Sequence, residues 1–268
     1  MTAKPAKAET EEPVLLRRDE GGVATLTLNR PQARNALNRG LMDALGHELE
    51  AIAADGAVKV VVVTAQGPVF CAGHDLKELR AEASREAYEA LFTQCSRLML
   101  AITRLKKPVI ASVQGMATAA GCQLVAACDL AVVSTAARFA TPGVNIGLFC
   151  STPMVALSRA VGRKQAMEML LTGEAVTAEE AKSIGLVNRV VPPETLETAT
   201  AELASEIAAK SPFTLAIGKE AFYRQIEMGL EEAYAYTSEV MTRNMLSRDA
   251  EEGVDAFLEK RPPAWRGC

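Results

Sequence analysis

The sequence lacks several features that would assign it to a large class of proteins. No apolar run reaches the roughly 18–20 residues that a membrane helix needs, so no membrane span is predicted. There is no run of basic residues and the net charge is −4, which argues against nucleic acid as a main partner. The chain also shows no internal repeat. These absences argue against a membrane-spanning protein, a nucleic-acid-binding protein and a repeat protein.

The cysteines do not form a pattern that indicates a metal site or a disulfide framework. They stand at positions 71, 95, 122, 128, 150 and 268. Four of them lie among apolar or small residues, as reduced core thiols do. We therefore expect no metal and a cytoplasmic location. The first 13 residues fit neither a secretory signal nor an Arg-rich transit peptide, and we expect a disordered tail.

The composition allows a large buried core, because 49% of the 268 residues are hydrophobic and 23% are charged. Short β-branched runs alternate with helical patterns, which predicts an α/β fold. Strands are predicted at 14–16, 23–28, 59–64, 109–113, 129–134 and 139–142, and a short extended run at 186–191. Helices are predicted at 35–54, near 75, and at 88–103, 162–172, 195–210, 212–225, 230–247 and 250–260. A further helix, from 177 to about 185, is predicted by the capping box Thr177-Ala-Glu-Glu180. We expect a core domain at 14–195 and a C-terminal helical region at 196–268 that is available for subunit contacts.

Two turns rich in small residues follow the buried strands 59–64 and 109–113. The first is Ala72-Gly-His74 and the second is Ala119-Ala-Gly121, which opens a helix. A helix start leaves backbone N–H groups without partners inside the helix. If the two turns lie side by side, one N–H from each could hold a single oxygen atom, as an oxyanion hole does. The alternative is a tight turn whose small residues serve packing alone.

Several motifs, which occur in the same order along the chain, resemble those of the crotonase (enoyl-CoA hydratase/isomerase) superfamily from about Val14 to Trp265. The blocks that carry the likeness are Leu28-Asn-Arg-Pro31 with Asn35-Ala-Leu37, Phe70-Cys-Ala-Gly-His-Asp-Leu76, Gly115 to Asp129, Phe139 to Gly147, Thr172-Gly173, Glu180 to Val187, and Gly253 to Arg261. A narrower likeness, to one group within the superfamily, rests on Leu148-Phe-Cys-Ser-Thr-Pro153 and Gly218-Lys-Glu-Ala-Phe-Tyr223.

The resemblance implies a spiral of ββα units with a C-terminal helical trimerisation region, and assembly into homotrimers or dimers of trimers. It also implies an acyl-CoA thioester as the ligand, with CoA as part of the substrate and no separate cofactor. By motif position, the N–H groups of His74 and Ala120 would hold the thioester oxygen. The residues that it places around the substrate and CoA are Arg34, Ala72, Asp75, Leu76, Lys77, Gly121, Phe257 and Lys260. For Arg34 and Lys260, a solvated surface role stays open.

The chain departs from the family at the two glutamates that handle water and the α-proton in active hydratases. Gln123 and Gly143 stand at their motif positions. An amide does not titrate near neutral pH and glycine has no side chain, so neither can act as a general base. The His74 imidazole could substitute for them, or it could be structural. Cys150 could be a nucleophile or a buried thiol, and a buried thiol is favoured.

These features leave several functions open. The first is hydration of a 2-enoyl-CoA through oxyanion-stabilised chemistry, with weak activity because both carboxylates are missing. Double-bond isomerisation is an alternative, since some relatives need only one acid–base group. A noncatalytic acyl-CoA-binding protein and a purely structural oligomer are the remaining possibilities.

Overall fold

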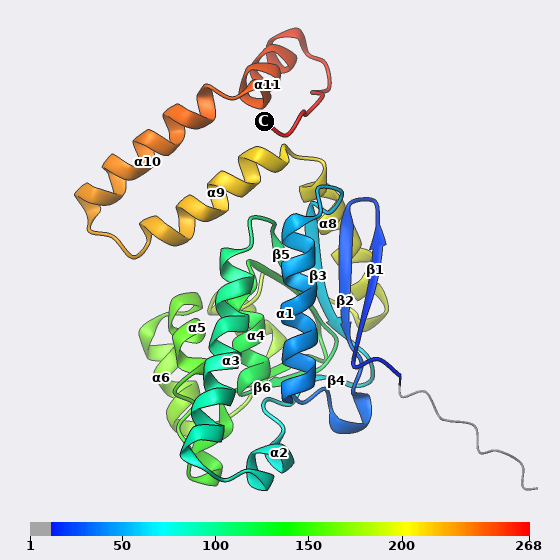
Figure 1. Ribbon diagram of the computed structural model, residues 1–268, viewed down its shortest axis with the longest axis vertical. Helices are drawn as coiled ribbons and strands as arrows, with labels where there is room; N and C mark the ends of the chain where they lie inside the picture. The colour runs from blue at the N-terminus through cyan, green and yellow to red at the C-terminus, as the bar shows by residue number, and fades with distance from the viewer. Residues whose placement is uncertain (1–11) are drawn as a thin grey trace, which may run out of the picture.

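The computed structural model describes residues 12–268 (Figure 1). The predicted disordered tail covers residues 1–13, and its residues 1–11 lie outside the described residues. The five strands from β2 onward in the larger sheet run parallel, and β1 closes one edge as an antiparallel hairpin with β2. In order across this sheet, the strands are β1 (Leu15–Glu20), β2 (Val23–Leu28), β3 (Val60–Ala65), β5 (Val109–Val113), β7 (Leu130–Ser134) and β10 (Arg189–Val191).

Three strands of the larger sheet each lead into a strand of a smaller, four-stranded sheet. Its strands, in order, are β4 (Val69–Cys71), β6 (Met116–Thr118), β8 (Arg138–Ala140) and β9 (Val176–Thr177). β3 leads into β4, β5 into β6 and β7 into β8, and helices follow each pair. The predicted spiral of ββα units is thereby confirmed. The sequence pattern does not predict β4 or β6, so the two small-residue turns are expected directly after the longer strands, whereas β4 and β6 precede them.

Helices cover both faces of the larger sheet, and β3 shows how its two faces are used. Val61 and Val63 point into the main core with helices α1, α3 and α4, whereas Val60 and Val62 pack against α8. This alternation follows from the two-residue period of a strand. The helices of this part are α1 (Arg39–Ala54), α2 (Leu76–Ala81), α3 (Arg85–Arg104), α4 (Ala120–Ala127), α5 (Pro153–Ala160), α6 (Arg163–Thr172), α7 (Ala178–Ser183) and α8 (Leu196–Ala208), with 3₁₀ turns η1 (Pro31–Ala33), η2 (Pro142–Ile146) and η3 (Pro193–Thr195).

The capping signals in the sequence correspond to real helix starts. The Asn38 side chain accepts from the Leu41 N–H at the start of α1, and Thr177 and Glu180 form a reciprocal capping box at the start of α7. α8, which the sequence analysis assigned to the C-terminal helical region, lies on the larger sheet. Its Thr200 hydroxyl is 3.0 Å from that of Ser112 on β5.

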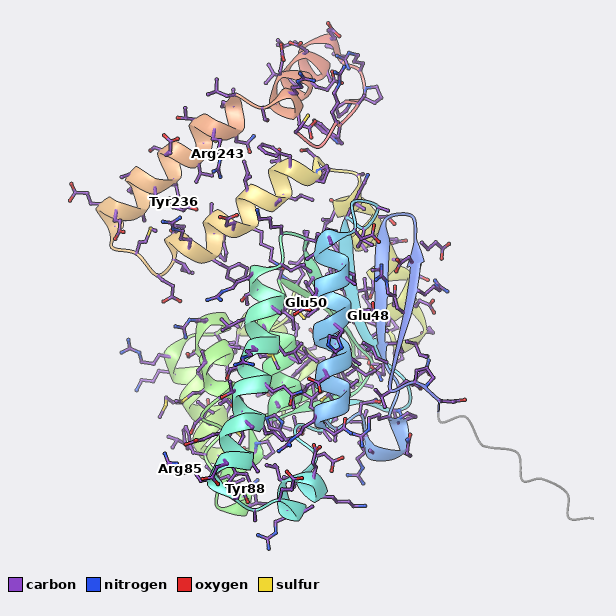
Figure 2. All side chains as sticks on the ribbon, viewed as in Figure 1. Glu48, Glu50, Arg85, Tyr88, Tyr236 and Arg243 are labelled. Atoms are coloured by element: carbon purple, nitrogen blue, oxygen red, sulfur yellow. The ribbon has the colours of Figure 1, made fainter. Side chains whose placement is uncertain are left out.

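The last three helices extend away from the sheets as an arm, which we define as α9 (Pro212–Gln225), α10 (Leu230–Met245) and α11 (Arg248–Glu259) (Figure 1). α9 and α10 lie side by side (Figure 1). The Arg224 guanidinium of α9 sits 4.5 Å from the ring centroid of Tyr236, which projects from α10 (Figure 2). Among residues 12–268, no helix is both long and apolar enough to cross a membrane.

Candidate functional site

The carboxyl ends of three parallel strands meet at one edge of the smaller sheet. β4 pairs with β6 in parallel and β6 pairs with β8 in parallel, so their following turns emerge together. These turns are Ala72–His74 after β4, Ala119–Ala120 after β6, and Thr141–Gly143 after β8. The Ala119 N–H donates to the Ala140 carbonyl at 2.9 Å, which joins the second turn to the end of β8, just before the third turn. The candidate site lies at this edge because the topology brings the three turns together.

The backbone N–H of His74 has no hydrogen-bond acceptor among the described residues. His74 forms a parallel bridge with Leu37, in which Leu37 donates to the Gly73 carbonyl at 2.8 Å and accepts from the Asp75 N–H at 3.1 Å. In such a bridge the middle residue, His74, directs its own N–H and C=O away from the partner strand. The His74 N–H therefore points to the side on which β6 and the start of α4 lie.

The backbone N–H of Ala120 is likewise without an acceptor in the part of the chain that the structure describes. Ala120 is the first residue of α4, and the preceding Ala119 has no side chain able to cap the helix. Ala119 adopts φ 49° and ψ −117°. An alanine in such a region costs on the order of 1–3 kcal/mol, and such costs cluster at functional sites. The strained turn leaves the positive end of the α4 dipole open.

The two turns that carry these N–H groups lie against each other, as predicted from the sequence. A Cβ built on Gly73 would lie 2.9 Å from the Ala119 Cβ and 3.4 Å from the Ala120 nitrogen. Gly73 also has φ +90°, which favours glycine. A Cβ on Gly121 would lie 2.3 Å from the Cys71 carbonyl oxygen, so the small size of Gly121 serves the contact between α4 and β4.

Gln123 lies buried on α4, one turn after Ala120. The Cys95 thiol on α3 lies 4.0 Å from its side-chain oxygen. Burial raises the pKa of the Cys95 thiol to about 12, so it stays protonated and can only donate weakly to that oxygen. The contact therefore supplies no carboxylate or thiolate beside Gln123.

Gly143 lies in η2, where the following segment folds back over it. A Cβ on Gly143 would lie 2.7 Å from the Leu148 carbonyl oxygen and 2.9 Å from Cys150 Sγ. Burial raises the pKa of the Cys150 thiol, which agrees with the favoured interpretation of a protonated buried thiol. Thr141, just before η2, is buried and its hydroxyl has no partner among residues 12–268. Neither the unpartnered Thr141 hydroxyl nor the closure over Gly143 can be predicted from the sequence. Both depend on how the backbone folds and not on the spacing of motifs.

Both ring nitrogens of His74 are buried, although the residue as a whole is half-buried. Neither ring nitrogen has a hydrogen-bond partner among the described residues, and the ring meets Phe92 of α3 edge-on with centroids 5.7 Å apart. Burial lowers the pKa of this imidazole below its ordinary value, which keeps the ring neutral. A catalytic role of the side chain stays a prediction.

The residues predicted to contact CoA divide into two groups. Asp75 caps α2 by accepting from the Lys77 N–H at 3.1 Å and pairs with Arg30, also at 3.1 Å. Burial alone would raise the pKa of Asp75, but Arg30 and the backbone N–H groups of Lys77 and Glu78 hold it below its usual value. Leu76, Lys77 and Arg34 are exposed near that cap, while Ala72 is half-buried beside it. Their CoA contacts stay predictions.

Phe257 and Lys260 lie at the end of α11, far along the arm from α2 within one chain (Figure 1). Phe257 is 82% exposed. A single chain therefore does not bring these two tail residues to the site at the strand ends.

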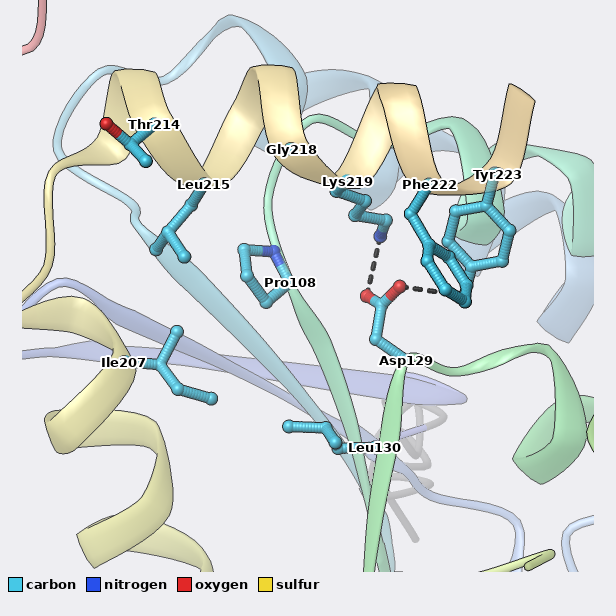
Figure 3. A pocket seen from close by; sticks show the side chains of 10 residues that line it. All are labelled: Pro108, Asp129, Leu130, Ile207, Thr214, Leu215, Gly218, Lys219, Phe222 and Tyr223. Carbon is cyan, nitrogen blue, oxygen red and sulfur yellow. Dashed lines mark hydrogen bonds and ion pairs between the residues drawn. The ribbon is translucent and has the colours of Figure 1, made fainter. Parts of the chain in front are cut away.

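A separate hollow lies between α8, α9 and the start of β7 (Figure 3). Lys219 and Asp129 form an ion pair at its wall, with Lys219 Nζ 2.6 Å from Asp129 Oδ2. Tyr223 donates to the other carboxylate oxygen at 2.9 Å. These polar groups satisfy one another, so they fix α9 to the sheet and are not free to bind a ligand.

Nearly the whole chain matches known proteins. The model of the family described as enoyl-CoA hydratase/isomerase matches residues 18–268. Enoyl-CoA hydratase domain-containing protein 3, mitochondrial, from Rattus norvegicus is 45% identical over 98% of this chain and 88% of its own length. The crystal structure of human enoyl-CoA hydratase domain-containing protein 3 is 46% identical, with a TM-score of 0.91 over 94% of this chain and 100% of that one. The narrower likeness found in the sequence is thereby confirmed.

A crystal structure of an enoyl-CoA hydratase from Mycobacterium smegmatis is 60% identical, with a TM-score of 0.93 over 95% of this chain and 99% of that chain. The prediction of a cytoplasmic location is wrong by these comparisons, since the curated relatives from rat, mouse, frog and human are all named as mitochondrial. Reduced cysteines misled that prediction, because they indicate a reducing environment and do not name the compartment.

The two-sheet spiral, the paired turns with free N–H groups and the match over nearly the whole chain lead to one conclusion. This chain belongs to the enoyl-CoA hydratase/isomerase family.

Proposed function

We propose that this chain binds an acyl-CoA thioester whose carbonyl oxygen accepts from the N–H groups of His74 and Ala120. One observation carries the proposal: two backbone donors from adjacent turns lie at one sheet edge, and neither has an acceptor among residues 12–268. Donors fixed in this way stabilise an oxyanion because they need no rearrangement when negative charge develops. Family membership supports the choice of an acyl-CoA as the ligand.

Hydration of 2-enoyl-CoA by this site is weak or absent. Gln123 and Gly143 supply no proton acceptor, and each well-placed acid–base group is worth about 10²- to 10⁴-fold in rate. Isomerisation is the alternative reaction, but it also needs a group that moves the α-proton. Retention of the donor pair without these groups favours binding and polarisation of the thioester over rapid turnover.

The arm supports the proposal that the chain assembles as a homotrimer or a dimer of trimers. Large apolar side chains on α10 and α11 face solvent in the single chain, which monomeric proteins rarely allow over a contiguous surface. They include Leu230, Tyr234, Met241, Leu246, Phe257 and Leu258. A second copy would cover this surface and could bring Phe257 and Lys260 to the neighbouring site.

The thioester contact can be tested on the ligand, without changing the protein. Calorimetry would compare butyryl-CoA with S-butyl-CoA, a thioether that has a methylene group in place of the carbonyl. Loss of two hydrogen bonds of about 0.5–1.5 kcal/mol each predicts roughly 5- to 150-fold weaker binding of the thioether. Equal affinities would remove the proposed role of the two N–H groups, and no binding of butyryl-CoA at millimolar concentration would end the proposal.

A steady-state assay of crotonyl-CoA hydration completes the experiment. We expect a rate at least about 100-fold below that of a hydratase with both carboxylates. A comparable rate would show that another residue replaces Gln123 and Gly143.

A further inference from the structure

The segment that follows η2 closes the place from which a side chain at position 143 would project. Besides its contacts with Leu148 O and Cys150 Sγ, a Cβ on Gly143 would lie 3.3 Å from the Cys150 backbone nitrogen. The φ of Gly143 is not positive, so its torsion angles do not by themselves require glycine. The closeness of the 148–150 segment is therefore what excludes a side chain here.

That segment is tied down at both ends. The Leu148 N–H donates to the Gly143 carbonyl at 2.9 Å, which closes the turn. Beyond it, the Met154 N–H donates to the Cys150 carbonyl at 2.9 Å at the start of α5. The Cys150 thiol could rotate away from a new side chain, but the Leu148 carbonyl could move only if the backbone moved with it.

η2 also packs against the end of α6. A Cβ on Gly173 would lie 3.1 Å from the Pro142 Cα and 3.1 Å from the Val144 Cγ2. η2 therefore contacts both α6 and the 148–150 segment, and a shift of Gly143 would disturb either contact. The backbone of the 148–150 segment therefore occupies the space that a carboxylate side chain at position 143 would need. The difference from a hydratase involves this segment as well as the residue at position 143.

We infer that the Leu148–Cys150 segment is the specificity element of this site, which commits it to holding acyl-CoA thioesters without adding water to them. It does so by filling the position of the second acid–base side chain with backbone and a buried thiol. This inference rests on the proposed function. It predicts that hydration cannot be restored by substitution at positions 123 and 143 alone, whereas the proposed thioester binding needs neither residue.

The steric part of the inference is tested by the thermal stability of Gly143→Ala. Overpacking against backbone predicts a fall in Tm of several degrees, about 2–10 °C. The matched control is Gly46→Ala on α1, where a Cβ meets nothing within 4 Å, and which should not lower the Tm. Cys150→Ala should reduce the cost of Gly143→Ala only in part, because the Leu148 carbonyl remains. A Gly143→Ala protein as stable as the parent would overturn the inference.

The functional part is tested by crotonyl-CoA hydration in Gln123→Glu and in Gln123→Glu/Gly143→Glu. We expect no gain in rate for the double variant over the single one. If the double variant fails to fold while Gln123→Glu folds, this result supports the steric exclusion of a side chain at position 143 by the 148–150 segment. A folded double variant whose rate exceeds that of the single variant about tenfold or more would overturn the inference.

Butyryl-CoA calorimetry on the parent protein separates the two proposals. If the parent does not bind butyryl-CoA, the proposed function fails, while the Tm of Gly143→Ala still reports on the closure of the segment. If the parent binds and the double variant hydrates crotonyl-CoA, the specificity inference fails and the proposed function stands.

Discussion

At the scale of single residues, His74 combines two properties in one position. Its backbone N–H is free and directed toward the start of α4, while its side chain packs against Phe92 with both ring nitrogens unpartnered in residues 12–268. The family motif indicates the first property, since a backbone N–H does not depend on the side chain. Burial of the ring follows only from the way α3 packs over the turn.

The buried ring predicts a dependence of stability on pH. Because burial lowers the pKa of His74 in the folded protein, the unfolded chain takes up a proton near pH 6.5 before the folded one does. The free energy of unfolding should therefore fall as the pH drops from about 7.5 to 5.5. His74→Phe should show a smaller fall in urea unfolding at these two pH values.

The control for this measurement is His47→Gln, a change at an exposed histidine on α1. An identical pH dependence in His74→Phe and the parent would mean that the His74 ring is protonated without penalty in the folded state.

At the scale of elements, α9 is anchored to the sheets by a partly buried ion pair (Figure 3). Lys219 Nζ donates to three acceptors, namely Asp129 and the carbonyls of Ile102 and Lys107, the last two at 3.0 Å. Burial opposes the charged form of Lys219 and lowers its pKa, although Asp129 acts in the opposite direction. Burial, followed by the negative charge of Asp129, raises the pKa of the Tyr223 hydroxyl.

Removal of one partner should cost more than removal of both. Lys219→Met leaves the partly buried Asp129 carboxylate without its counter-ion, although the Val109 N–H and the Tyr223 hydroxyl still donate to it. This change predicts a loss of about 1–3 kcal/mol in the free energy of unfolding. Tyr223→Phe removes one hydrogen bond and should cost about 1 kcal/mol. Chemical unfolding of Lys219→Met, Asp129→Asn and the double variant would measure the coupling. Strictly additive losses would contradict the pairing.

At the scale of the whole molecule, the arm has an apolar surface that the rest of residues 12–268 does not cover. Leu246 is 83% exposed and Leu230 is 77% exposed. The arm holds its own shape at its far end, where the buried Asp249 accepts from Ser211 at 2.6 Å and from the Arg266 N–H at 2.7 Å. A preformed arm with an apolar face is suited to seat against another copy.

We predict that Leu246→Glu lowers the molar mass measured by size-exclusion chromatography with light scattering. A buried charge in a subunit interface has no partner there and opposes association. Glu50→Lys on α1, away from the arm (Figure 2), should leave the mass unchanged. A parent protein that elutes as a monomer would contradict the proposed assembly.

Local patterns in the sequence were sufficient for most helices and for the strands of the larger sheet. β2, β5 and α9 have their predicted bounds, since alternation, β-branched runs and Pro at a helix start act over a few residues. The motifs also placed the pair of turns that carry His74 and Ala120. The acyl-CoA ligand, by contrast, came from the resemblance and not from these local patterns.

Only the tertiary structure decided how those turns meet and what closes over Gly143. β4 and β6 are three residues each, too short for a periodic signal, yet their parallel pairing sets the site edge. The collision at Gly143 involves a carbonyl five residues later in the chain, and a backbone carbonyl carries no signature in the sequence. Side-chain type is written in the chain, whereas the path of the backbone depends on contacts between distant segments.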